Sequence, residues 1–131
     1  MDHADDNLFQ VSVKGMFFDE GKKLMMIQEK NGLWELPGGR MQKDESFIEC
    51  LKRECQEETG LECEVLDRQP SIVYSTVDGR ARNRIMLCYR VQFSNLNFKR
   101  SDECVDIKFF TKDEIRQLST FPQLKQLADF L

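Results

Sequence analysis

The chain has 131 residues, a formal net charge of −4, 40% hydrophobic residues, seven glycines and three prolines. This length suits one domain, so we expect residues 1–131 to form a single domain. The composition excludes collagen-like, low-complexity and wholly disordered proteins. No apolar run approaches the ~18 residues of a membrane span, and the acidic first residues lack the basic and apolar regions of a signal peptide.

The acidic balance argues against a nucleic-acid polymer as partner, because such a surface needs clustered positive charge. A small anionic ligand stays possible, since a bound divalent cation can supply the missing charge. The five cysteines form no Cys-x-x-Cys pair. Without a signal peptide, we expect reduced thiols in a cytoplasmic protein that does not associate with a membrane. The single histidine, His3, is expected to be a solvated terminal residue rather than a zinc ligand.

The first third of the chain predicts strands. Residues 9–18 alternate partly and are rich in β-forming side chains, and residues 24–27 form a second apolar run. The turn sequence at 19–22 between them predicts a hairpin. Residues 37–39, Pro-Gly-Gly, are expected to lie outside regular structure.

A helix is predicted over residues 46–59. Ser46 with Glu49 three residues later forms a capping-box pattern, which marks a helix start. Apolar residues then recur at helical spacing, including Leu51 and Cys55. Gly60 suits the left-handed conformation that ends many helices.

The remainder of the chain predicts further strands and two terminal helices. The expected strands are 62–66, 71–77, 84–93 and 105–110, and the expected helices are 112–118 and a last amphipathic one opened by Phe121 and Pro122. The Asp78-Gly79 pair indicates a hairpin between the second and third of these strands, with a loop longer than the tightest type. The mixture predicts an α/β domain.

Three glutamates stand out on the helix predicted over 46–59. Glu54, Glu57 and Glu58 are spaced i, i+3 and i+4, so their carboxylates share one side of the helix and repel one another. Carboxylate oxygens are the ligands that Mg²⁺ and Mn²⁺ prefer, so the cluster could be a metal platform. The alternative is a solvated acidic face paired with Lys52 and Arg53. Spacing alone leaves both interpretations open.

The stretch 39–61 resembles the Nudix box, Gly-x5-Glu-x7-Arg-Glu-U-x-Glu-Glu-x-Gly-U, in which U is aliphatic. The matching residues are Gly39, Glu45, Arg53, Glu54, Glu57, Glu58, Gly60 and Leu61. Cys55 fills one aliphatic slot, which changes packing but not chemistry. The box covers 23 of the 131 residues, and the preceding Trp34-Glu-Leu-Pro-Gly-Gly is also typical of the family.

The resemblance implies a Nudix-type α/β/α sandwich of the α+β type, with a mixed sheet and the catalytic helix at about 46–59. It implies divalent-metal-dependent hydrolysis of a diphosphate linkage in a nucleoside diphosphate-X, such as a (d)NTP, ADP-ribose or a nucleotide sugar. Mg²⁺ is the expected metal, with Mn²⁺ as a possible substitute, and the partner is a small-molecule nucleotide. The alternative is a catalytically weak Nudix-like nucleotide-binding or regulatory module. A monomer and a homodimer both stay open.

The resemblance also assigns roles within the box. The implied metal ligands are the Gly39 backbone carbonyl and the carboxylates of Glu54, Glu57 and Glu58. Glu54 is a ligand in some members and the general base in others. Arg53 is expected to orient its neighbouring carboxylate, whereas Glu45 is expected to be structural.

Two further groups lie outside the box. Glu103 matches a downstream acid of the family, as an extra ligand or the general base, and Asp102 is its rival. Arg82 and Arg84 are candidate substrate-binding residues, because in an extended segment they and Arg80 would share a face and could hold phosphates bidentately. A solvated strand edge is the alternative for these arginines.

Overall fold

The computed structural model describes residues 7–131, so His3 and the acidic start of the chain lie outside the described residues. The larger sheet has the strand order β4-β1-β7-β5, and β6 also pairs with β7. Its strands are β1 (Gln10–Met16), β4 (Gly38–Arg40), β5 (Cys63–Val65), β6 (Ile72–Val77) and β7 (Asn83–Phe93). The pair β1·β7 is parallel and the other pairs are antiparallel, so the sheet is mixed, as expected.

A smaller antiparallel sheet has the order β3-β2-β8. Its strands are β2 (Leu24–Gln28), β3 (Trp34–Glu35) and β8 (Asp106–Phe110). Within the described residues, the predicted hairpin is present only at its turn, where Phe18 and Leu24 form an isolated antiparallel bridge and the Met25 N–H donates to the Phe17 carbonyl at 2.8 Å. The prediction was wrong for the strands themselves, because β1 and β2 pair in different sheets. Between them the Phe17 ring packs edge-on against Phe93 and Phe109, at centroid distances of 5.6 and 5.7 Å. These apolar contacts hold the segment between β1 and β2 in place where the chain passes from the larger sheet to the smaller one.

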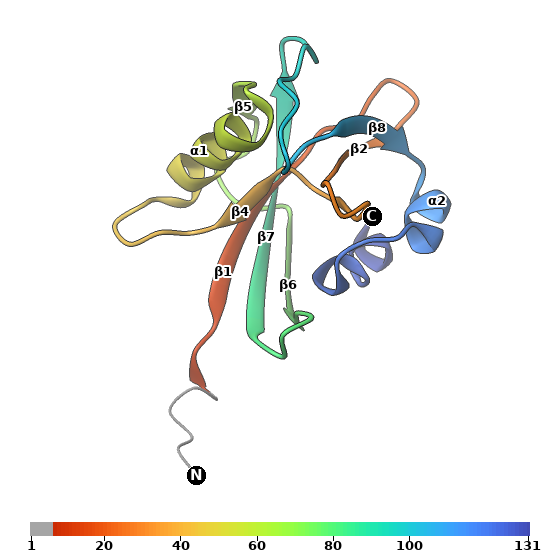
Figure 1. The fold of residues 1–131 in the computed structure, drawn as a ribbon. Helices are drawn as coiled ribbons and strands as arrows, with labels where there is room; N and C mark the ends of the chain where they lie inside the picture. The colour runs from red at the N-terminus through yellow and green to blue at the C-terminus, as the bar shows by residue number, and fades with distance from the viewer. Residues whose placement is uncertain (1–6) are drawn as a thin grey trace.

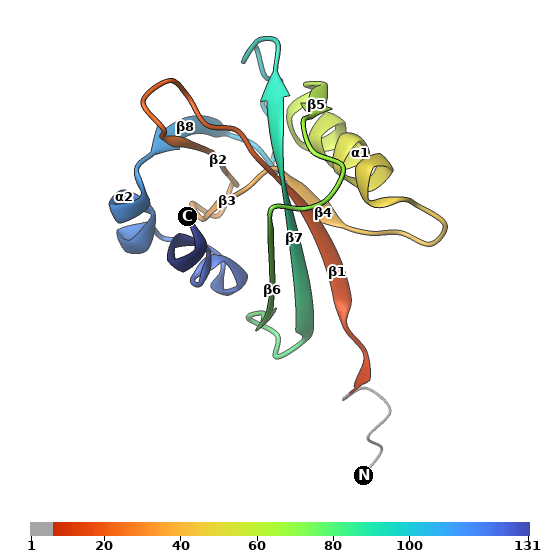
Figure 2. The ribbon, with the colours of Figure 1, turned by 180° about the vertical axis from the view of Figure 1, so that it is seen from behind.

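Helical segments lie on both sides of the sheets (Figures 1 and 2). The helix α1 (Phe47–Thr59) lies on one side, and α2 (Lys112–Gln117) with the C-terminal turns lies on the other. One buried cluster joins α1 to the larger sheet and includes Val13, Leu51, Cys55, Tyr89 and Val91. A second joins the sheets to the C-terminal segments and includes Met16, Leu24, Met86, Ile115 and Leu124. The predicted α/β/α arrangement is confirmed.

The boundaries of α1 follow the sequence signals. Ser46 and Glu49 form the complete capping box, in which each side chain accepts a hydrogen bond from the other residue's backbone N–H. Gly60 ends the helix in the left-handed conformation, with φ of 72°. Cys55 is fully buried, so the departure from the aliphatic pattern is accommodated by packing.

The predicted last amphipathic helix is wrong. The segment instead forms two short 3-10 helices, η2 (Pro122–Leu124) and η3 (Leu127–Phe130). Neither begins with a side-chain cap, and a segment this short gains too few helical hydrogen bonds to offset nucleation. Burial of Leu124 and Leu127 in the core fixes its path instead.

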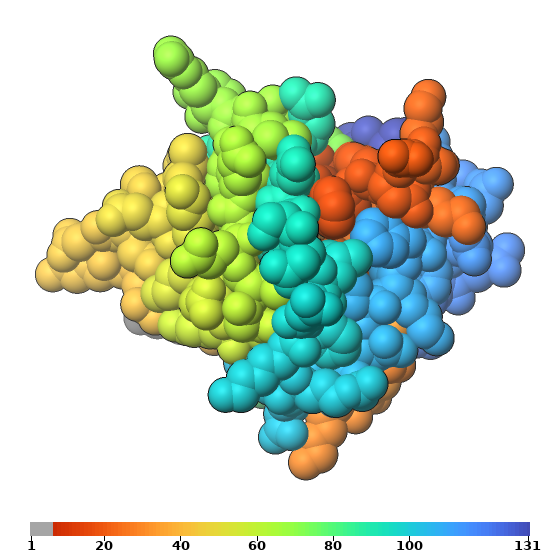
Figure 3. All heavy atoms as spheres, turned by 90° about the horizontal axis from the view of Figure 1, so that it is seen from above, coloured from red at the N-terminus to blue at the C-terminus, as the bar shows by residue number. Residues whose placement is uncertain are grey.

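One local expectation is confirmed, because the strands β6 and β7 form an antiparallel hairpin around a loop that begins at Asp78. The five cysteines are buried and free in the structure. Seen from above, the segment after β7 crosses between the α1 region and the β8 region (Figure 3). Among the described residues no helix has both the length and the apolar character needed to cross a bilayer.

Candidate active site

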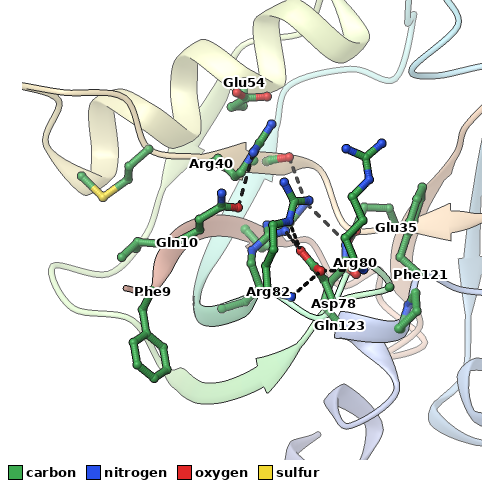
Figure 4. Close-up of a pocket in the computed structure, with 18 of the residues that line it drawn as sticks. Phe9, Gln10, Glu35, Arg40, Glu54, Asp78, Arg80, Arg82, Phe121 and Gln123 are labelled. Carbon is green, nitrogen blue, oxygen red and sulfur yellow. Dashed lines mark hydrogen bonds and ion pairs between the residues drawn. The ribbon is translucent and has the colours of Figure 1, made fainter. Parts of the chain in front are cut away.

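A cleft of about 1210 Å³ opens between α1 and β4 on one side and the loop that joins β6 to β7 on the other (Figure 4). Its acidic lining residues are Glu29, Glu35, Glu54, Glu58, Asp78 and Glu103, and its basic ones are Lys14, Arg40, Lys43, Arg80, Arg82 and Arg84. The charges balance, but they are not evenly mixed. Glu54 lies on the α1 side, whereas Asp78, Arg80 and Arg82 lie together on the loop side.

Two glycines bring the backbone close to the acidic side. Gly38 has φ of 122°, and a Cβ atom there would lie 2.1 Å from the Val13 carbonyl oxygen. A Cβ atom at Gly39 would lie 2.5 Å from a carboxylate oxygen of Glu54. Both glycines belong to β4, so the expectation that residues 37–39 lie outside regular structure was wrong for these two. Their missing side chains allow β4 to pair with β1 and Glu54 to approach the turn.

Glu58 is the more deeply placed of the two α1 carboxylates in the cleft. It is buried, and its Oε1 accepts a hydrogen bond of 2.8 Å from the Gly38 N–H. Burial raises the pKa of Glu58 well above its usual value, despite the nearby charge of Lys14 and this hydrogen bond. Glu58 is therefore a carboxylate whose negative charge is incompletely compensated by the residues around it.

Arg53 binds three carboxylates of the predicted box. Its Nε and Nη2 donate to Glu45 at 2.5 and 3.0 Å. Its Nη1 donates to Glu54 at 2.9 Å and to Glu57 at 3.1 Å. Hydrogen bonding to Arg53 lowers the pKa of Glu45 to about 2. Arg53 thus orients Glu54, and Glu45 holds Arg53.

The structure separates the three clustered glutamates of α1, Glu54, Glu57 and Glu58. Glu54 and Glu58 line the cleft, but Glu57 does not, and its side chain is 54% exposed beside Arg53. Among the described residues, no group of three or more His, Cys, Asp or Glu side chains gathers closely enough to hold a metal ion. The residues that could take part in a metal site are thus Glu54, Glu58 and the backbone of β4 at Gly38 and Gly39. Glu57 could join them only if its side chain left Arg53.

This donor set fits a metal such as Mg²⁺. That ion keeps several waters and binds proteins through one or two carboxylates plus the phosphates of its substrate. Glu54 and Glu58 supply two carboxylates, and the close approach of Glu54 to Gly39 adds a backbone segment beside them. A preformed cage of protein ligands is not required for an ion with this preference.

Glu103 lines the same cleft, whereas its rival Asp102 does not. Asp102 is exposed and lies 3.9 Å from Lys30. The segment is held in place because the Ser101 hydroxyl donates to the Glu58 carbonyl at 3.2 Å and the Lys30 N–H donates to the Asp102 carbonyl at 2.8 Å. These contacts bring Glu103, which is distant in the sequence, to the cleft beside the C-terminal end of α1.

The arginines do not alternate along an extended segment as expected. Arg80 and Arg82 belong to the loop, and only Arg84 lies in β7, where it is buried. Asp78 causes this arrangement, because its Oδ2 accepts from Arg82 Nε at 2.9 Å and from Arg84 Nη1 at 3.1 Å. Arg82 and Arg84 both line the cleft, but a structural ion pair already engages each of them.

Sequence reasoning missed the buried lysine of the cleft. Lys14 Nζ donates to the carbonyl oxygens of Gly38 at 3.0 Å and Leu36 at 3.4 Å, and it lies 3.4 Å from Glu35. Burial disfavours its charge, but the attraction of Glu35 and Glu58 outweighs that effect and raises the pKa of Lys14. The available signal was a polar residue at every second position of residues 10–14, which marks a polar face on an otherwise apolar strand.

Besides Asp78, two carboxylates of the cleft were missed as site residues. Glu35 is buried, with Oε1 near Lys14 and accepting from the Leu36 N–H, and Oε2 accepting from Gln123 at 3.3 Å. Glu29 follows β2, and burial together with the charge of Glu35 raises its pKa. Neither position belongs to a repeating pattern, so only the fold brings them to the cleft.

Residues 8–130 match the family described as the NUDIX domain. A MutT-like protein of Streptomyces ambofaciens is 33% identical over 111 residues, which cover 84% of this chain and 69% of that protein. The 8-oxo-dGDP phosphatase NUDT18 of Homo sapiens is 41% identical over 71 residues, which cover 47% of this chain and 22% of that protein. The matched part is thus about a fifth of the length of this second relative.

Solved structures share the fold. The chain superposes on an ADP-ribose pyrophosphatase from Streptococcus suis with a TM-score of 0.64 and 24% identity, covering 95% of this chain and 87% of the other. The fold, the residues of the box along α1 and the family match over nearly the whole chain agree. The chain belongs to the Nudix family of hydrolases.

Proposed function

We propose that this chain, acting as a single catalytic domain, hydrolyses a diphosphate linkage in a nucleotide with the help of a divalent metal ion, Mg²⁺ or Mn²⁺. The observation that carries the proposal is the convergence of Glu54, Glu58 and the two glycines of β4, Gly38 and Gly39, in one cleft. A relative named 8-oxo-dGDP phosphatase and a structural neighbour named ADP-ribose pyrophosphatase add support, because both names denote nucleotides that contain a diphosphate.

The residues of the cleft have different roles in this proposal. Glu54 and Glu58, with the carbonyl at Gly39, would hold the metal, and Glu57 could be added to them if it left its contact with Arg53. A metal bound there would neutralise phosphate charge and make a bound water more acidic. Arg53 keeps Glu54 oriented.

A carboxylate of the cleft removes the proton of the attacking water. Glu54 and Glu103 are the two candidates for this general base, because both line the cleft. Arg82 and Arg84, on the opposite side, bind or position the substrate.

The test is a panel of nucleoside triphosphates, nucleoside diphosphates, ADP-ribose and nucleotide sugars, incubated with Mg²⁺ or Mn²⁺. Phosphate release is measured with and without added pyrophosphatase or alkaline phosphatase, so that products without free phosphate are also detected. Turnover that disappears in EDTA and in Glu54→Gln, but persists in Glu64→Gln, supports the proposal. Glu64 is a matched control because it is exposed on β5 and does not line the cleft. Metal-independent binding without turnover of any substrate would contradict it.

A further inference from the structure

Asp78 organises the loop side of the cleft. Its Oδ1 accepts hydrogen bonds from the backbone N–H groups of Arg80 at 2.8 Å and Arg82 at 3.1 Å. Its Oδ2 accepts from the side chains of Arg82 and Arg84. A carboxylate has about four lone-pair sites, so Asp78 is saturated. These hydrogen bonds outweigh desolvation and hold the pKa of Asp78 well below its usual range, so it stays charged.

Several donors on this side lack an acceptor. Within residues 7–131, the Arg80 guanidinium has no hydrogen-bond or ion-pair partner, and Arg82 uses only its Nε. Arg84 is 6% exposed, its Nη2 donates to the Ser12 hydroxyl, and its buried Nε has no partner among those same residues. Figure 4 shows Arg80 and Arg82 extending from the loop that carries Asp78 into the cleft. The arrangement presents unsatisfied N–H groups and three positive charges against one negative charge.

The chemistry of these donors selects an anion. Guanidinium groups bind phosphate oxygens through paired N–H donors. A guanidinium group can also pair with a nucleobase edge that presents only acceptors, such as guanine N7 and O6. Such an edge is neutral, however, and leaves the excess positive charge of Arg80, Arg82 and Arg84 over Asp78 uncompensated. A phosphoryl group accepts hydrogen bonds only, so it matches what this side offers.

We propose that Arg80 and Arg82, positioned by Asp78 and backed by Arg84, form a subsite for a phosphoryl group of the substrate beyond the two that flank the bond to be broken. Its role in substrate choice rests on the proposed function, because the diphosphate itself is assigned to the Glu54 and Glu58 side of the same cleft. The enzyme is then a hydrolase that prefers nucleotides with a third phosphate to those with two. Arg84 acts as a buried support rather than as the main ligand, which refines its expected role.

The first experiment measures binding without turnover. Inorganic tripolyphosphate is titrated calorimetrically into the wild type, Arg80→Gln, Arg82→Gln and Arg116→Gln, all in EDTA. Arg116 is the matched control, because it is an exposed arginine on α2 outside the cleft. We expect at least a fivefold loss of affinity in Arg80→Gln and Arg82→Gln, and less than a twofold change in Arg116→Gln. Because the Arg80 side chain has no partner within the described residues, its variant tests binding even if Arg82→Gln perturbs the loop.

Three results overturn the subsite. Unchanged affinity in Arg80→Gln does so, as does an equal loss in Arg116→Gln, which would show that only net charge matters. An equal loss of affinity for guanosine, titrated in parallel, would assign the arginines to a base.

The second experiment measures the ratio of kcat/KM for a nucleoside triphosphate to that for the matching diphosphate, which Arg80→Gln should lower at least fivefold. An unchanged ratio overturns the proposed preference. If the wild type turned over no nucleotide, the proposed function would fail while the calorimetric result still decided the subsite.

Discussion

Two buried carboxylates in one cleft behave in opposite ways. Glu58 on α1 is 7% exposed and Asp78 in the loop is 8% exposed, so desolvation acts on both. Burial raises the pKa of Glu58, whereas the pKa of Asp78 is lowered because its hydrogen bonds outweigh burial. Asp78 receives hydrogen bonds from two backbone N–H groups and two guanidinium groups, and Glu58 receives one from Gly38. The four hydrogen bonds that Asp78 accepts, against one for Glu58, separate a carboxylate that positions its neighbours from one whose charge is incompletely compensated.

The largest expected effect tests whether the residues needed for turnover lie on the α1 side of the cleft. Glu54→Gln keeps the shape of the side chain and removes its charge, so we expect turnover to fall about 10²–10⁴-fold. Folding should be unaffected, because the amide oxygen can still accept from Arg53. Steady-state kinetics and circular dichroism check this, with Glu64→Gln as the control. A folded variant with near wild-type turnover would remove Glu54 from the site.

The next prediction tests whether a divalent metal ion compensates the charge of Glu58. If a divalent cation supplies the missing partner of Glu58, Mg²⁺ at a hundredfold excess over its dissociation constant should stabilise the folded protein by about 2.7 kcal/mol. Thermal melts in EDTA, in Mg²⁺ and in NaCl of matched ionic strength measure this. The increase should be absent in NaCl and weakened in Glu58→Gln. An equal response to Mg²⁺ in the wild type and in Glu58→Gln would contradict the assignment.

Asp78→Asn tests the opposite carboxylate. The amide keeps one acceptor oxygen but loses the charge that two guanidinium groups face, so unfolding free energy should fall by about 2 kcal/mol. Urea unfolding measures the change. The Mg²⁺ response should be kept, in contrast to Glu58→Gln. A variant as stable as the wild type would show that the ion pairs with Arg82 and Arg84 are dispensable.

The smallest effect concerns pH. The pKa of Glu45 is lowered to about 2 by hydrogen bonding to Arg53, from an unfolded value of about 4.3. A lowered folded-state pKa gives stability that is present above the unfolded value and lost as pH falls through the folded value. The stability advantage of the wild type over Glu45→Gln should therefore shrink between about pH 5 and 2. Urea midpoints across this range test it, and a constant difference would contradict it.

Local signals predicted most of α1 and its surroundings. The capping box at Ser46, the left-handed Gly60 and the buried Leu51 and Cys55 depend on neighbouring residues, so the sequence contains what is needed to recognise them. The partition of the first two strands into separate sheets depends on the packing of Phe17 against residues about 80 positions away, and no local pattern contains that information.

The residues of the site also fall into those that the sequence pattern predicted and those that it did not. The box residues Glu54 and Glu58 were predicted, and both line the cleft. Glu57 was grouped with them by helical spacing, but its competing contact with Arg53 takes it out of the cleft. Lys14 and Asp78 were missed as site residues, because their roles arise from partners on other strands and from the geometry of a loop.

The parallel pairing of β1 with β7 has a consequence for the order of folding. In this register Gln10 lies opposite Arg84, so β1 has no central partner until the chain has been made to that point. At about 5–20 residues per second, the wait during synthesis is roughly 4–15 seconds. Closure of so long a loop also slows folding from the denatured state. During this interval β4 can pair with one edge of β1, but the other edge keeps its backbone N–H and C=O groups unpaired within the chain.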